Sequence, residues 1–132
     1  MSQESARHRA SLWLRQAQDD LRAARLLQEG GQAAQACFLA QQVGEKAIKA
    51  LLAADDRDLR SHSLKALLQE LDQAHAQRWQ RQARVLDKLY APTRYPDALG
   101  DELPADVFGP EDGASALQAA EELLDWASDQ LQ

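Results

Sequence analysis

β-Branched residues are scarce in this chain, and their scarcity limits the possible folds more than any other feature. Among 132 residues, only Val43, Ile48, Val85, Thr93 and Val107 belong to this class. Strands favour such residues because a branched side chain packs well on a pleated surface. The chain instead contains 25 alanines and 21 leucines, which are strong helix formers. The composition therefore predicts an all-α protein.

Apolar residues recur at intervals of three and four, the spacing that places them on one face of a helix. We expect Gly30 and Gly31 to end the first helix, Ser61 or Ser63 to cap the third, and Asp112 to cap the last. The pattern predicts an up-and-down antiparallel bundle of four to five helices, with residues 1–132 forming a single domain. The expected helices cover about residues 5–29, 32–54, 64–71, 76–90 and 113–131.

Charge and composition exclude several classes of function. The net charge of −6 argues against an extended basic face that coats nucleic acid, although a local basic pocket is compatible with it. No apolar run approaches the roughly 20 residues of a membrane span, and the first residues do not resemble a signal peptide, so we expect a cytoplasmic protein without membrane contact. The single cysteine, Cys37, is expected in the core. No metal-ligand spacing occurs, and we expect neither a metal nor a cofactor.

The helix expected over residues 32–54 carries a polar stripe opposite its alanines. Gln42, Glu45, Lys46 and Lys49 lie on this stripe when the helix turns by about 100° per residue. One interpretation is a solvated face with a Glu45–Lys49 ion pair at i,i+4 spacing. The other is that the lysines bind an anionic ligand.

His62 is a candidate general acid or base, since imidazole titrates near neutral pH. Its neighbourhood in the sequence contains no carboxylate or second histidine at a spacing that would orient it, so a structural role is the alternative. Arg57 precedes it by five positions and would stabilise a phosphate if the intervening segment folds back.

The segment from residue 91 to 110 contains all four prolines and no helical stripe. Loops of this length in a compact domain are usually functional or disordered. Two prolines flank Arg94 and Tyr95, which suits a rigid recognition loop. Alternatively, Tyr90 and Tyr95 plug one end of the bundle while Arg94 pairs with Asp97 or Glu45.

Several short motifs, taken in order, resemble the HEPN domain (higher eukaryotes and prokaryotes nucleotide-binding). The resemblance spans about residues 17–131, and the combination is far more specific than any single motif. The motifs are Gln18-Asp19-Asp20-Leu21, the stretch Gln41 to Leu51 (QQVGEKAIKAL), His62-Ser63-Leu64, Leu86-Asp87-Lys88-Leu89-Tyr90 and Thr93-Arg94-Tyr95-Pro96-Asp97.

The resemblance implies a helical bundle that commonly dimerises and is often encoded beside a minimal nucleotidyltransferase. It also implies a role in binding nucleotide or RNA. Some relatives are toxin ribonucleases with an arginine four to six residues before a histidine, a spacing that Arg57 and His62 meet. In those enzymes the motif lies on a late helix and a tyrosine often follows two positions later. Here the motif comes earlier and Leu64 takes that position.

Three hypotheses follow, and catalysis is less expected than binding. The leading one is a homodimeric module, of toxin–antitoxin or regulatory type, that acts with a nucleotidyltransferase. Its groove would bind nucleotide or RNA phosphate. The second is a metal-independent ribonuclease with His62 as general base and Arg57 or Arg94 stabilising charge. The third is a purely structural subunit of a nucleotidyltransferase complex. The groove residues would be Lys46, Lys49, His62, Arg94 and Tyr95.

Overall fold

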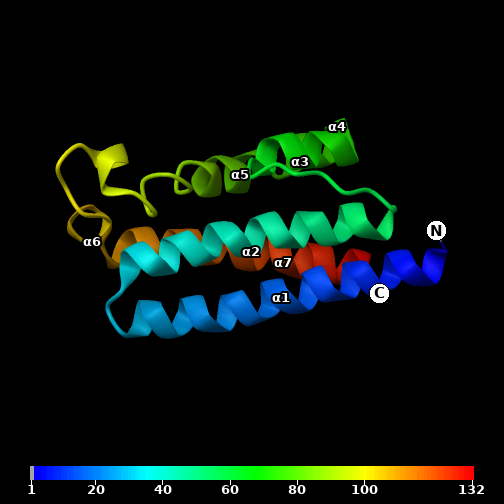
Figure 1. Cartoon of the computed structure of the whole chain (residues 1–132), viewed down its shortest axis with the longest axis horizontal. Helices are drawn as coiled ribbons and strands as arrows, with labels where there is room; N and C mark the ends of the chain where they lie inside the picture. Colours follow the sequence, from blue (N-terminus) through cyan, green and yellow to red (C-terminus); the bar gives the residue numbers. More distant parts are fainter. Residues whose placement is uncertain (1) are drawn as a thin grey trace.

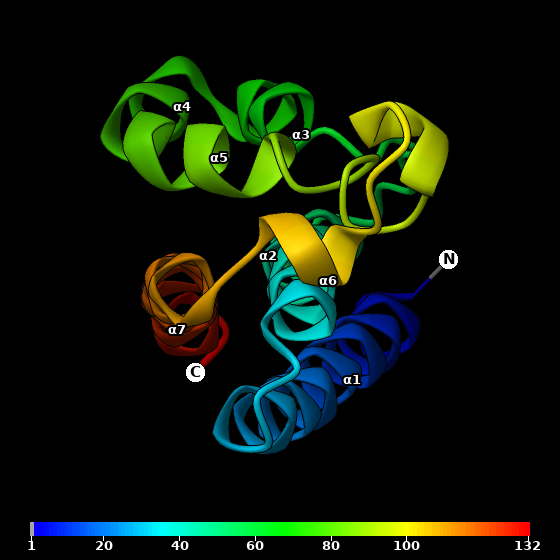
Figure 2. The same ribbon diagram turned by 90° about the vertical axis from the view of Figure 1, so that its left-hand side faces the viewer.

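A central helix, α2 (Ala33–Ala54), organises the structure, a computed structural model that describes residues 2–132. Other helices pack around it on several sides, as the end-on view shows (Figure 2). Small residues make this packing close, because Ala36, Ala40 and Ala47 are fully buried and let neighbouring backbones approach. Even the polar stripe of α2 is largely covered, so it is not the solvated face that one interpretation of the sequence predicted, although the Glu45–Lys49 ion pair of that interpretation does form at 2.9 Å.

Two long helices flank α2. The first, α1 (Gln3–Glu29), runs antiparallel to α2, and it ends at Gly30 as predicted. The last, α7 (Pro110–Gln130), runs in the same direction as α2 (Figure 1). The bundle is therefore not strictly up-and-down. The segment 55–63 causes the difference, because it turns at residues 55–56 and then returns along α2 before the next helix begins (Figure 1).

A third layer consists of α3 (Leu64–Leu71), α4 (Gln73–Arg78) and α5 (Gln80–Asp87). Ser63 caps α3 by accepting a hydrogen bond from the Ala66 amide at 3.2 Å, as predicted. The single helix expected over residues 76–90 is instead divided at Trp79. That residue leaves helical geometry and packs its ring against Trp126 of α7, with ring centroids 5.1 Å apart.

The proline-containing segment also has more helix than its sequence predicts. It forms the 3₁₀ turn η1 (Pro96–Leu99) and the short helix α6 (Pro104–Val107). Residues 2–132 thus contain seven α-helices, so the expected four to five was too few. Asp112 is not the N-cap of α7. Pro110 starts the helix earlier, with Gly109 as N-cap, and the Asp112 carboxylate accepts a hydrogen bond from the Gly109 amide at 2.8 Å.

The core lies between α2 and the surrounding layers. Leu64, Leu86 and Leu123 come from three different helices and are completely buried around α2. Cys37 is also fully buried, which confirms its expected role as a small core residue. Burial raises the pKa of its thiol to about 11, so the thiol stays protonated and unreactive at neutral pH.

Candidate functional site

Glu45 is a buried carboxylate at the centre of a hydrogen-bond network on α2. Its side chain accepts hydrogen bonds from Lys49 Nζ at 2.9 Å and from Gln41 Nε2 at 3.3 Å, and both donors lie one helical turn away. Nδ1 of His62 lies 3.1 Å from Glu45 Oε1. Glu45 is only 4% exposed, so these partners replace the water that its charge would otherwise need.

The network keeps Glu45 ionised. Burial by itself raises the pKa of this carboxyl. The hydrogen bonds from Lys49, His62 and Gln41, together with the positive charge of Lys49, outweigh that effect and hold the pKa of Glu45 below its ordinary value of 4.5. At neutral pH the carboxylate is therefore a fixed negative charge next to the imidazole of His62.

Next to Glu45, the side chains of His62, Tyr90, Arg94 and Phe38 are stacked on one another. The His62 ring lies parallel to the ring of Tyr90, with centroids 4.6 Å apart and an interplanar angle of 20°. The Arg94 guanidinium lies 4.3 Å from the Tyr90 ring centroid and 4.5 Å from that of Phe38. We call the group of Phe38, Glu45, His62, Tyr90 and Arg94 the Arg94 site.

Among the residues that the structure describes, the positive charge of Arg94 has no carboxylate partner. In residues 2–132 it forms no ion pair within 4 Å, so it pairs with neither Asp97 nor Glu45. Its Nη1 donates a hydrogen bond to the hydroxyl of Tyr90 at 3.2 Å, whereas its buried Nε has no partner among the described residues. Two aromatic faces thus hold a guanidinium whose hydrogen-bonding capacity is mostly unused.

Asp87 of α5 fixes the position of His62, although no spacing in the sequence singled it out for this role. Its carboxylate accepts hydrogen bonds from the backbone amides of Leu64 at 2.7 Å and Lys65 at 3.2 Å. These are free donors at the first turn of α3, where a negative charge is stabilising. The start of α3 is thereby tied to α5, and His62, two residues earlier, is held over α2.

The predicted site residues divide into those that meet and those that do not. Lys49, His62 and Arg94 belong to one connected group through Glu45 and Tyr90. Lys46 instead pairs with Asp20 of α1 at 2.6 Å. Tyr95 is about half exposed, so it does not plug the bundle end.

Arg57 is separate from His62. Its guanidinium binds the Glu70 carboxylate at 2.8 Å and also the Glu70 carbonyl oxygen. The sequence spacing of Arg57 and His62 therefore does not produce a shared site, because residues 57–62 form no helix that would bring the two together and Glu70 of α3 is the partner of the arginine.

Glu45 is the partner of His62 that sequence reasoning missed. The two residues are 17 positions apart and belong to different elements, so no local spacing indicates their contact. A weak signal exists in Gln41 and Glu45, since two polar residues one turn apart on the central helix of a bundle need a buried partner. Gln41 Nε2 indeed also donates to the His62 carbonyl oxygen at 3.1 Å.

Comparison with known proteins places the chain in a family. The family model described as "HEPN domain" matches residues 10–130. This chain belongs to the HEPN family. A solved structure, TT1696 from Thermus thermophilus, is 36% identical, with a TM-score of 0.86 over 92% of this chain and 97% of that one. ST0689, described as an archaeal HEPN homologue, is 35% identical, with a TM-score of 0.79 over 94% and 98%.

No curated protein matches this HEPN chain significantly. Within residues 2–132, no three or more histidine, cysteine, aspartate or glutamate side chains gather in a way that could hold a metal ion. None of the helices described is both long and apolar enough to span a bilayer.

Proposed function

We propose that this HEPN protein binds the phosphate of a nucleotide or of an RNA end at the Arg94 site. The observation that carries the proposal is the Arg94 guanidinium, which is positioned by Phe38 and Tyr90 and left without a carboxylate. A guanidinium presents a planar set of donors that matches phosphate oxygens. In a chain of net charge −6, an arginine held in place without an anion is a specific feature rather than part of a general basic surface.

The neighbouring groups suit the rest of such a ligand. The His62 side chain is 58% exposed, so its outer face is open to a second phosphate oxygen or a hydroxyl. Tyr95, exposed and next to Arg94 in the chain, would stack on a base. Lys46 and Lys49 are each neutralised by a carboxylate, so we assign them to the rigidity of the site rather than to direct contact with the ligand.

Arg94→Ala tests this binding. We expect wild type to bind ATP, GTP or a short single-stranded RNA, and the variant to bind at least tenfold more weakly, because a charge-assisted hydrogen bond is worth about 1.5–3 kcal/mol. Isothermal titration calorimetry measures both affinities. Arg22→Ala is the matched control, since Arg22 pairs with Asp19 on the surface and lies on α1. Equal affinities for wild type and Arg94→Ala, or no binding by wild type, would contradict the proposal.

One observation favours a ribonuclease as a second candidate function. Glu45 lies against Nδ1 of His62, which leaves Nε2 as the free nitrogen, the arrangement of an oriented general base. In such a reaction Nε2 takes the proton of a ribose 2′-hydroxyl, and the 2′-oxygen attacks phosphorus. The bond from phosphorus to the 5′-oxygen breaks, which leaves a 2′,3′-cyclic phosphate, and the 5′-oxygen takes a proton from water. Arg94, rather than Arg57, would stabilise the charge that develops on the phosphate.

A His62→Ala variant separates cleavage from binding. If the protein is a ribonuclease, wild type degrades a short RNA in the absence of metal ions, and the variant loses at least about a hundredfold in rate, as removal of a general base typically does. Gel analysis of a labelled RNA measures the rate. His8→Ala should retain full activity, because His8 is exposed on α1. RNA that stays intact with wild type would exclude this second function.

The assembly around the site is also part of the proposal. We propose that the chain forms a homodimer, because cleavage or clamping of RNA needs two copies of the Arg94 site that face each other. We also propose a minimal nucleotidyltransferase as its partner. Exposed Leu12, next to half-buried Trp13 on α1, supports a surface for association. Light scattering and co-purification with the product of an adjacent gene check these two points, and a monomer without such a partner would refute them.

A further inference from the structure

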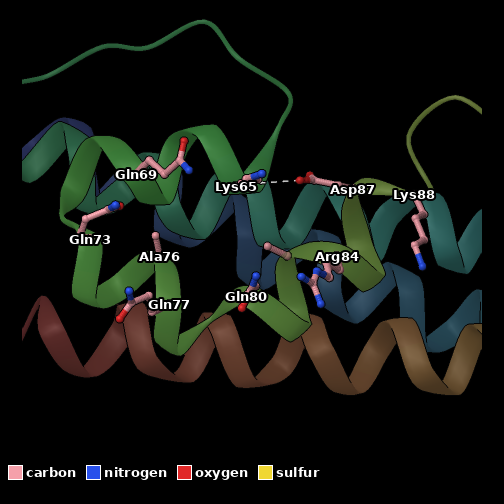
Figure 3. Close-up of a pocket in the computed structure, with 10 residues that line it drawn as sticks. Lys65, Gln69, Gln73, Ala76, Gln77, Gln80, Arg84, Asp87 and Lys88 are labelled. Atoms are coloured by element: carbon pink, nitrogen blue, oxygen red, sulfur yellow. Dashed lines mark hydrogen bonds between the residues drawn. The ribbon is translucent and has the colours of Figure 1, made fainter.

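A cavity separate from the Arg94 site lies between α3, α4 and α5. Its volume is about 350 Å³, within the range of pockets that accept small ligands. Figure 3 shows its lining side chains distributed along the three helices, with Gln73 near one end and Lys88 near the other. The lining residues are Lys65, Gln69, Gln73, Ala76, Gln77, Gln80, Ala83, Arg84, Asp87 and Lys88.

The charges in this cavity are unbalanced. Lys65, Arg84 and Lys88 contribute three positive charges, and Asp87 is the one carboxylate among the ten lining residues. Both oxygens of Asp87 are already hydrogen-bonded to the first amides of α3. Its charge is therefore balanced mainly by the helix terminus and not by the three cations.

None of these three cations has a carboxylate within 4 Å in the part of the chain that the structure describes. Arg81 on the same helix differs, because it pairs with Glu122 at 3.5 Å. Arg84 and Lys88 are also one helical turn apart, a like-charge spacing that weakens a helix. An acidic chain that leaves three cations unpaired around one cavity has the electrostatics of an anion site.

The uncharged part of the lining indicates the class of ligand. Four glutamines surround the cavity, and each carboxamide both donates and accepts hydrogen bonds, as the hydroxyls of a sugar require. Ala76 and Ala83 supply small apolar surface. None of the ten residues is aromatic, so the cavity offers no ring for stacking a base. We propose that this cavity binds a small phosphorylated sugar, with the phosphate on Arg84 and the two lysines and the hydroxyls on the glutamines.

Calorimetry with ribose 5-phosphate, ribose and inorganic phosphate tests the proposal. We expect ribose 5-phosphate to bind at least tenfold more tightly than inorganic phosphate, and ribose to give no measurable heat. Arg84→Gln should weaken ribose 5-phosphate binding at least tenfold. Arg81→Gln, the control on the same helix, should leave it unchanged. Gln80→Leu should weaken the binding of ribose 5-phosphate but not that of inorganic phosphate.

Three outcomes would overturn the proposal. They are no binding of ribose 5-phosphate, equal loss in Arg84→Gln and Arg81→Gln, and equal affinity for ribose 5-phosphate and inorganic phosphate. Circular dichroism of each variant checks that the fold is intact. The substituted residues are exposed on α5, so we expect each variant to fold. Arg94→Ala should bind ribose 5-phosphate like wild type, so this site and the proposed nucleotide site succeed or fail independently.

Discussion

Replacing Glu45 with alanine is expected to lower the free energy of unfolding by about 3–5 kcal/mol, the range seen when one member of a buried ion pair is removed. The substitution leaves the Lys49 ammonium, which is 13% exposed, without its carboxylate. It also removes the acceptor for Gln41 and His62. Urea denaturation followed by circular dichroism measures the change.

An exposed ion pair provides the control for this prediction. Glu70→Ala removes the Arg57 partner at the surface, where such a pair is worth about 1 kcal/mol or less. If Glu45→Ala and Glu70→Ala cost the same, the Glu45 network does not stabilise the fold in the way its geometry indicates.

The pH dependence of stability in a second variant, Glu45→Gln, gives a further measurement. Because the folded-state pKa of Glu45 lies below 4.5, its ionised form stabilises the protein fully above that pH. The stabilisation is lost as the pH falls below 4.5 and through the folded-state pKa. The difference in stability between wild type and Glu45→Gln should therefore shrink under acidic conditions. A difference that stays constant from about pH 7 to about pH 3 would show that ionisation of Glu45 is not responsible.

Gly44→Val is expected to lower the free energy of unfolding by about 3 kcal/mol, at the upper end of the usual cost of overpacking a core. A Cβ atom at Gly44 would lie 2.7 Å from Leu64 Cδ2 and 2.7 Å from Leu86 Cδ1. Both leucines are fully buried, so neither can move into solvent. The valine adds two further methyl groups to this contact.

Denaturation of two further variants checks the Gly44 prediction. Gly44→Ala should be less damaging, since alanine favours the helix by about 1 kcal/mol and the leucine ends can shift slightly. Gly109→Ala should cost only about 1 kcal/mol, because a Cβ there meets nothing within 4 Å and only the N-cap preference for glycine over alanine is lost. A Gly44→Val protein as stable as wild type would mean that α3 and α5 do not pack as closely on α2 as the structure has them.

Gly44 and Glu45 are adjacent, and together they connect the core to the candidate site. The missing side chain at Gly44 lets α3 and α5 approach α2 closely. That approach brings His62, which precedes α3, and Tyr90, which follows α5, over Glu45. A substitution at Gly44 should therefore disturb ligand binding at the Arg94 site as well as stability.

Local chemistry accounts for the helix boundaries that the sequence predicted correctly. Gly30 ends α1 and Ser63 caps α3 because these signals act within one helical turn. The prediction of Asp112 as the N-cap of α7 was wrong because Pro110, two residues earlier, also favours the start of a helix, and α7 begins there. The division at Trp79 was missed because the packing of that ring against Trp126, in a distant part of the chain, determines it.

The candidate site was only partly visible in the sequence for the same reason. Its members come from α2, from the segment before α3 and from the segment after α5. Spacing along the chain suggested the pairs Arg57–His62 and Arg94–Asp97, and neither forms. Tertiary packing instead joins Glu45 with His62 and places Arg94 between two aromatic rings.

The sequence by itself determined the all-α class, most helix ends and, through its motifs, the HEPN resemblance that the comparisons confirmed. These properties depend on residue preference and on contacts within a few positions. Only the tertiary structure decided that the polar stripe of α2 is covered, that Glu45 orients His62, and that Arg94 pairs with no carboxylate within residues 2–132. Burial and the pairing of charges depend on which helices pack against each other. The scarcity of β-branched residues indicates the all-α class but contains no information about those helix contacts.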